Sequence, residues 1–276
     1  MLTLKGIHIV SLALNVPGPV AAARLQEMGG SITKIEPQSG DPLMLYSSEW
    51  YEQLARGQQV LKLDLKETVQ RGQFDELLKY SDLLITSMRL PALERLALDW
   101  SRLHRRFPNL SQIALIGYSS ENKNLAGHDL NYQSALGLIS PPQLPKTLFA
   151  DIAAAERIVS TALLLLLARE KRLKASGYAE VSIYETAKIF AAPLHYDLTS
   201  RGGTLGGGDA AYNLYRTADG WIALAALEPH FWNRLLAELN LQNANRKELK
   251  NIFLTDTSEN WTEWAKKRDI PITAVV

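Results

Sequence analysis

The architecture expected for this chain follows from residues 7–36, which read IHIVSLALNVPGPVAAARLQEMGGSITKIE. The β-branched run Ile7–Leu12 predicts a buried strand, and the prolines after it mark a turn where a helix can begin. We expect that helix over residues 20–28, ended by the glycine pair at 29 and 30. A second strand is predicted over residues 31–36. A strand, a helix and a strand in this order form a βαβ unit, which predicts a parallel sheet.

Strand-like and helix-like segments continue to alternate up to about residue 200. Further strands are expected over 60–65, 83–85, 110–116 and 179–183, and further helices over 74–80, 92–98, 103–107, 151–171 and 184–192. Segments 37–49 and 118–145 are expected to be loops. No Gly-x-Gly-x-x-Gly motif follows the first strand, so the sequence does not support a dinucleotide site there. We predict an α/β fold, with a large Rossmann-like parallel-sheet domain over residues 1–200.

The composition changes after residue 200. Segment 201–209, RGGTLGGGD, is interpreted as a flexible linker, although its glycines would also let backbone N–H groups approach an anion. Ala218-Asp219-Gly220 separates two strand-like runs and predicts a hairpin. Helices are expected over 230–239 and 261–268. We therefore predict a smaller α+β domain over residues 201–276.

Composition also limits the functional classes. The 30 basic and 29 acidic residues leave a net charge of +1, which gives no support for nucleic acid or an anionic membrane as a partner. The absence of cysteine excludes disulfides, thiolate nucleophiles and zinc–cysteine sites, and no metal site is predicted. The longest apolar run, 161–168, is too short to span a bilayer, and the N-terminus lacks the layout of a signal peptide. We expect a cytoplasmic protein.

Two side chains suited to proton transfer near neutral pH stand at apparent turns of the chain. His128 lies in the segment 126–132, AGHDLNY, and Asp151 precedes an apolar helical run. The pattern alone favours a simpler interpretation. In it, Asp151 caps its helix and His128 is an ordinary loop histidine.

The motifs taken together resemble the family III CoA-transferase superfamily of CaiB/BaiF type, which includes α-methylacyl-CoA racemase. The segments that carry the resemblance are Gly18-Pro19, Gly29-Gly30, Lys34–Glu36, Gly40-Asp41, Leu63–Lys66, Leu93–Arg95, Gly127–Tyr132, Asp151 and Tyr215–Gly220. The resemblance implies that Asp151 is a catalytic carboxylate, which in the transferases attacks an acyl-CoA thioester. In the racemases His128 would be a second base, and Glu228 would support it as a hydrogen-bond partner.

The same resemblance implies where the substrate binds. Lys66 and Arg95 match family positions near the CoA nucleotide, and Arg56 and Arg89 are nearby candidates; the alternative for all four is a solvated surface charge. Asp129 and Tyr132 match positions that line the thioester pocket, with loop packing as the alternative. CoA would enter as part of an acyl-CoA substrate, and no separate cofactor is expected. The enolate oxygen would accept hydrogen bonds from N–H groups at the start of the Asp151 helix.

The resemblance further implies an interlocked homodimer whose active sites combine the large domain of one chain with the small domain of its partner. Relatives continue beyond the point matching residues 272–276 with a segment that returns to the large domain, and we expect this segment to be absent. Two family patterns are altered: Ala153–Ala155 replace glycines, and Ala55–Gln58 replace an Asn-Arg-x-Lys motif.

Three functions follow as hypotheses. The first is an acyl-CoA racemase or epimerase that inverts the α-carbon of a 2-methyl-branched thioester through an enolate. The second is a CoA-transferase in which Asp151 forms a mixed anhydride. The third, prompted by the altered patterns, is a member that binds a CoA-like ligand without turnover.

Overall fold

A computed structural model describes residues 3–123 and 125–276 of the chain. These residues form two compact units, one that ends at residue 190 and one over 191–276. The first unit ends at Phe190, whereas the sequence placed the boundary between residues 200 and 201.

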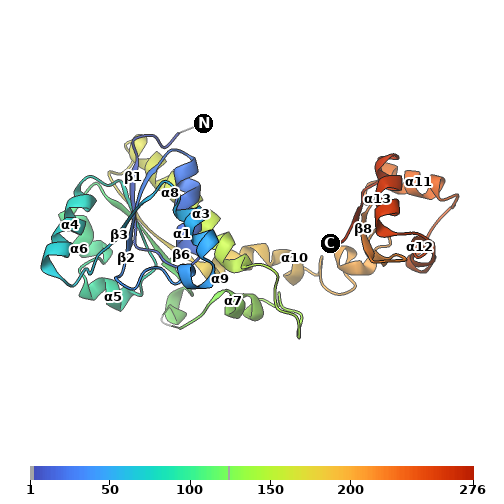
Figure 1. Cartoon of the computed structure of the whole chain (residues 1–276), viewed down its shortest axis with the longest axis horizontal. Coiled ribbons are helices and arrows are strands. Elements are labelled where there is room, and N and C mark those ends of the chain that lie inside the picture. Colours follow the sequence, from blue (N-terminus) through green and yellow to red (C-terminus); the bar gives the residue numbers. More distant parts are fainter. Residues whose placement is uncertain (1–2, 124) are drawn as a thin grey trace. The chain divides into compact units, whose positions relative to one another are not determined.

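The first unit is built on a six-stranded sheet with the order β3-β2-β1-β4-β5-β6 (Figure 1). Its strands are β1 (His8–Ser11), β2 (Ser31–Glu36), β3 (Gln59–Lys62), β4 (Leu83–Thr86), β5 (Ser111–Ile116) and β6 (Tyr178–Ser182). Every neighbouring pair is parallel. This order is that of doubly wound nucleotide-binding folds and confirms the predicted α/β class. From the centre of the sheet, successive strands are added toward one edge from β1 to β3 and toward the other edge from β4 to β6. At this switch point between β1 and β4, such sheets have a crevice at the carboxyl ends of their strands.

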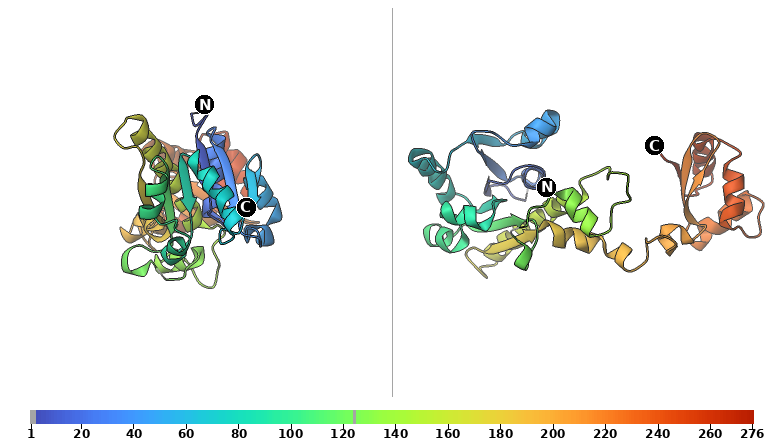
Figure 2. Two further views of the ribbon diagram at one scale, coloured as in Figure 1. Left: turned by 90° about the vertical axis from the view of Figure 1, so that its left-hand side faces the viewer. Right: turned by 90° about the horizontal axis from the view of Figure 1, so that it is seen from below.

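Helices cover both faces of this sheet (Figures 1 and 2). Helices α4 (Thr68–Lys79), α5 (Leu90–Arg95) and α6 (Trp100–Arg106) lie on one side. On the other side α1 (Pro17–Glu27) packs against α8 (Phe149–Glu170), and α9 (Ile183–Phe190) also packs against α8. Parallel strands need such crossover helices, because each connection must return to the amino end of the sheet.

Two short helices, α2 (Leu43–Tyr46) and α7 (Asp129–Ala135), lie in segments that the sequence predicted as loops. A third, α3 (Ser48–Ala55), begins at the end of the first of these segments. The loop predictions over 37–49 and 118–145 were therefore wrong in these parts. A loop remains between α7 and α8, and it projects from the first unit as the green segment in Figures 1 and 2.

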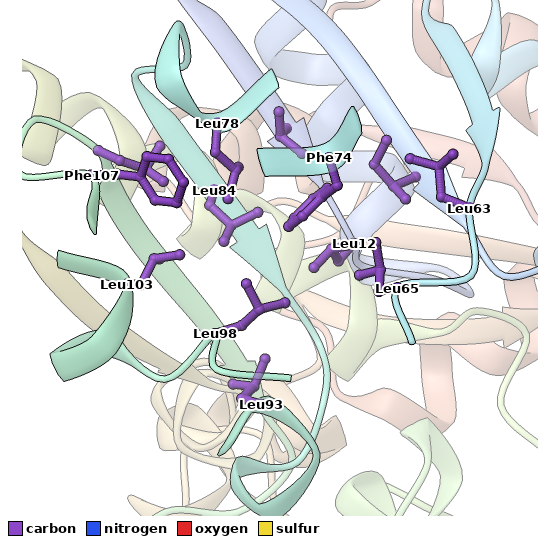
Figure 3. Packing of buried hydrophobic residues seen from close by; sticks show 13 residues of the cluster. Leu12, Leu63, Leu65, Phe74, Leu78, Leu84, Leu93, Leu98, Leu103 and Phe107 are labelled. Atoms are coloured by element: carbon purple, nitrogen blue, oxygen red, sulfur yellow. The ribbon is translucent and has the colours of Figure 1, made fainter. Parts of the chain in front are cut away.

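The core beneath α4, α5 and α6 explains why the central strands are mostly apolar (Figure 3). Leu83, Leu84 and Ile85 of β4 are each 0% exposed, as expected for a parallel strand with helices on both faces. Phe74 and Leu78 from α4 join the same cluster as Leu84. Burial of this face fixes the strand ends, and with them the crevice.

A buried ionic network ties β2 to the segment that follows it. The Lys34 ammonium lies 2.6 Å from Asp41 Oδ2 and 2.9 Å from Glu36 Oε1, and the Tyr51 hydroxyl donates to Glu36 at 2.8 Å. Asp41 Oδ1 also accepts the N–H groups of Asn15 and Leu43, both at 2.9 Å. The family segments around Lys34 and Asp41 thus have a structural role in joining β1, β2 and α2.

Replacing Lys34 by methionine should destabilise the protein strongly, because Glu36 and Asp41 would keep buried charges without a cation. Loss of one partner from a buried pair costs about 3–5 kcal/mol. Urea unfolding at pH 7 measures the change. Lys79→Met is the matched control: Lys79 pairs with Glu76 on the surface of α4, and such exposed pairs contribute about 0–1 kcal/mol. Equal destabilisation by both variants would contradict the role given to Lys34.

The second unit is an α+β structure. Its antiparallel sheet contains β7 (Tyr212–Arg216), β8 (Trp221–Ala225) and β9 (Ile272–Ala274), in that order. Its helices are α10 (Ala192–His195), α11 (Pro229–Glu238), α12 (Arg246–Phe253) and α13 (Ser258–Lys266). The predicted hairpin between β7 and β8 is confirmed.

The glycine-rich segment of this unit is a tightly packed turn, so its interpretation as a linker was wrong. It contains the short turn η2 (Thr204–Gly208). A Cβ atom at Gly206 would lie 1.7 Å from the Ser200 carbonyl oxygen, and one at Gly203 would lie 2.1 Å from that of Asp197. Here glycine is required because backbone packs directly on backbone.

Candidate active site

A cavity of about 430 Å³ lies at the carboxyl ends of β1, β4 and β5. Leu14 follows β1, Ser87 and Arg89 follow β4, and Gly117 follows β5. His128, Tyr132 and Asp151 line the same cavity. The structure therefore brings the predicted histidine and carboxylate together at the crevice of the sheet.

Asp151 lies in the first turn of α8 and not at the N-cap position that the sequence pattern favoured for it. The helix begins at Phe149 and its N-cap position is Leu148, so Asp151 is not the cap. The cap acceptor comes from elsewhere: Asp129 Oδ1 accepts the N–H groups of Ala150 at 2.8 Å and Asp151 at 3.1 Å. The sequence predicted that N–H groups at the start of this helix bind the enolate oxygen. The N–H groups of Ala150 and Asp151 are instead occupied by Asp129.

Burial, and to a smaller extent the negative charge of Asp129, raise the pKa of the Asp151 carboxyl to about 7. Burial disfavours the ionised form, and a nearby like charge adds to this effect. At neutral pH the protonated and ionised forms are thus both abundant. Such a carboxyl can donate a proton in one turnover and accept one in the next.

His128 occupies the N-cap position of α7 and is exposed at the cavity. Its backbone N–H donates to Asn131 Oδ1 at 3.0 Å, which fixes the start of the helix. The first turn of α7, at Asp129 and Leu130, has N–H groups without an intrahelical acceptor. These two groups follow His128 directly along the chain.

Tyr132 is buried and forms part of the cavity wall. Its hydroxyl donates to the Gly127 carbonyl at 2.9 Å, and its ring packs edge-on against Tyr118 with the centroids 5.0 Å apart. A Cβ atom at Gly117 would lie 2.4 Å from the Tyr132 hydroxyl, and one at Gly127 would lie 2.9 Å from the ring. Both glycines are therefore needed to admit this ring.

The four predicted CoA cations are exposed, and three of them line cavities. Arg89 lines the main cavity, and Arg89 and Arg95 line a neighbouring hollow. Lys66 lines a separate cavity of about 420 Å³ beside the ends of β1 and β2. Met88 contributes to all three, so they adjoin one another. Arg56, at the end of α3, is not among the residues that line them.

Glu228 lies in the second unit, exposed at the N-cap position of α11. Its pairing with His128 remains a prediction.

The cavity also contains residues that the sequence analysis did not single out. Lys123 and Glu180 form an ion pair of 3.6 Å in its wall, beside Tyr178. Gln133, buried behind Asp129, was also missed. Its only signal was its place four residues after Asp129, which puts both side chains on one face of a helix.

Among residues 3–123 and 125–276, no group of three or more acidic or histidine side chains could hold a metal ion. The same residues include no helix long and apolar enough to cross a bilayer.

Similarity to known proteins agrees with this geometry. Human alpha-methylacyl-CoA racemase is 29% identical over 96% of this chain and 71% of its own length. The succinyl-CoA–L-malate CoA-transferase alpha subunit of Chloroflexus aurantiacus is 25% identical over 90% of this chain and 66% of its own length. The crystal structure of Rv3272 from Mycobacterium tuberculosis has the same fold, with a TM-score of 0.87 at 22% identity over 100% of this chain and 84% of that one.

The sequence profile of CoA-transferase family III matches residues 4–276. Racemases and transferases both occur among the relatives, and their shared chemistry supports an enzyme that acts on CoA thioesters. With the profile covering almost the whole sequence, this chain belongs to CoA-transferase family III.

Proposed function

We propose that this protein is an acyl-CoA racemase or epimerase that inverts the α-carbon of a 2-methyl-branched acyl-CoA. The observation that carries the proposal is that His128 and Asp151 line one cavity, while the pKa of Asp151 is raised to about 7. A reaction that runs in both directions needs groups that can each give and take a proton at the working pH.

In the proposed reaction, one base removes the α-proton from one face of the thioester. The electron pair of the broken C–H bond moves into the thioester and forms an enolate. The conjugate acid of the other base then protonates the same carbon from the opposite face. His128 serves one face and Asp151 the other, and N–H groups in the first turn of α7 stabilise the enolate oxygen.

The remaining predicted residues take supporting roles in this proposal. Lys66, Arg89 and Arg95 bind the phosphates of CoA from the adjoining cavities, with Arg56 at the edge of the site. Tyr132 shapes the wall next to the thioester. We also propose a homodimer, in which Glu228 of the partner subunit fixes the tautomer of His128 by a hydrogen bond.

Incubation of a single epimer of a 2-methylacyl-CoA in deuterated buffer tests the proposal. We expect deuterium to enter at the α-carbon and optical purity to fall, because each inversion exchanges the α-proton with solvent. Proton NMR and chiral chromatography measure the two changes. Retention of both the proton and the optical purity would rule the racemase out.

A CoA-transferase is the second candidate, since Asp151 is a carboxylate in the cavity and relatives such as the C. aurantiacus subunit are transferases. Its ionised carboxylate would attack the thioester carbonyl, form a mixed anhydride and release CoA as the thiolate. Hydroxylamine converts such an anhydride to a hydroxamate. Mass spectrometry after incubation with acyl-CoA and hydroxylamine would find this product at Asp151 only if the transferase route operates.

A further inference from the structure

Asp129 connects the two helix ends that carry His128 and Asp151. It follows His128 directly and is the first residue of α7. Its carboxylate reaches across to α8, where Oδ1 accepts the N–H groups of Ala150 and of Asp151 itself. The Asp129 side chain is 3% exposed, so these bonds form away from solvent, where hydrogen bonds to a charged acceptor are strong.

Gln133 holds the other oxygen of this carboxylate. Its side-chain N–H donates to Asp129 Oδ2 at 2.6 Å and to the Thr147 carbonyl at 3.2 Å. Thr147 lies just before α8, so Gln133 also connects α7 to the turn that leads into that helix. Gln133 is itself 3% exposed. Because its amide nitrogen donates both hydrogen bonds in a buried environment, Gln133 holds Asp129 firmly against the turn before α8.

We propose that Asp129 is the positioning residue that sets the His128 and Asp151 side chains relative to one another, and that Gln133 locks it in place. The proposal rests on the proposed function in taking His128 and Asp151 as the two bases. It adds a group that touches neither the reacting carbon nor its proton. Asp129 has two distinct effects: its oxygens hold the first turn of α8, and its charge favours the protonated form of Asp151.

Other charged and titratable groups also face this region. The cavity wall holds Arg89, Glu121, Lys123, His128, Tyr132, Tyr178 and Glu180. On the helices packed against α8, Arg24 of α1 pairs with Glu27 and Glu156, and Glu185 of α9 accepts from Ser119. Asp129 is the group whose charge acts on Asp151 in the direction of protonation.

Carboxyl ¹³C NMR of the full-length protein separates the two effects without needing turnover. Asp129→Asn keeps an oxygen that can accept from Ala150 and Asp151, but removes the charge. We expect the amides of these two residues to stay protected from hydrogen exchange. The midpoint of the Asp151 carboxyl titration should fall by about one pH unit from its value near 7. Asp129→Ala should lower the midpoint and also lose the amide protection. Asp151→Asn assigns the signal.

Gln133→Leu, which alters neither His128 nor Asp151 itself, is expected to reduce the protection of the Ala150 and Asp151 amides from hydrogen exchange. Glu121→Gln is the matched control, because it removes a carboxylate from the same cavity wall and should leave the Asp151 midpoint unchanged. An unchanged midpoint in Asp129→Asn, or full protection in Asp129→Ala, would overturn the positioning role. If the wild-type protein shows these NMR effects but exchanges no α-proton, the positioning role stands and the racemase proposal fails.

Discussion

Replacing Asp151 by asparagine is expected to lower kcat for α-proton exchange by roughly 10²–10⁴-fold, the usual contribution of a positioned acid or base. Asparagine has nearly the same size and keeps the backbone N–H that donates to Asp129. The helix start should therefore survive, and the loss should reflect missing proton transfer. Glu76→Gln, on the surface of α4, is the activity control.

The same substitution is expected to make the protein more stable at pH 8. The carboxyl has a pKa of about 7 in the folded protein, against an ordinary value of 3.8 for aspartate. Between pH 4 and pH 7 the unfolded chain therefore releases this proton while the folded protein keeps it, so stability falls as pH rises through this window. Above pH 7 both states are ionised and the penalty is constant. The asparagine side chain does not titrate and escapes the penalty.

Urea unfolding of the wild type and Asp151→Asn at pH 4 and pH 8 measures this effect. A pKa difference of this size corresponds to roughly 4 kcal/mol as an upper limit, and partial exposure of the side chain lowers it. The advantage of the variant should be present at pH 8 and nearly absent at pH 4. A variant that is less stable than the wild type at pH 8 would show that Asp151 is held as a favourable buried charge.

The sheet was predictable from the sequence because most of its strands contain short runs of apolar or β-branched residues. The predicted strand over residues 31–36 has the bounds of β2, and the predicted strand over 83–85 lies within β4. Both faces of β4 are buried, so Leu83, Leu84 and Ile85 carry a signal that needs no knowledge of the neighbours. Among the crossover helices, α1, α4 and α8 are long enough for their period to be recognised.

Helix α7 was missed for the opposite reason. It has seven residues, Asp129–Ala135, and therefore about two turns. Gly127 and Gly137 lie close to its two ends, and glycines at such positions favour the prediction of a loop. Its buried side chains include Asp129 and Gln133, which are polar. A hydrophobic period cannot identify such a helix, because its inner face makes hydrogen bonds to α8 in place of apolar contacts.

The electrostatic character of the site was equally hidden in the sequence. Family resemblance placed His128 and Asp151 on the candidate list, but no pattern links Asp129 to the N–H groups of a helix that starts some 20 residues later. The cap and the raised pKa of Asp151 depend on that tertiary contact. Local signals can assign an N-cap only when the cap lies next to its own helix.

Replacing His128 by glutamine should make exchange depend on which epimer is supplied. With one base left, Asp151 can still remove the α-proton from the epimer that presents its proton to α8. That epimer should take up deuterium without inversion, since the same group returns the proton to the same face. The other epimer should lose exchange by roughly 10²–10⁴-fold.

Proton NMR of each pure epimer in deuterated buffer gives both rates for the variant. The His128 side chain is exposed, and its residue is tied to α7 through the backbone N–H. The thermal midpoint should therefore change little, which separates lost chemistry from lost folding. Equal exchange of both epimers in the variant would show that His128 is not a base in this reaction. Loss of exchange from both would place His128 and Asp151 on one face, as a relay to a single proton, and would end the two-base mechanism.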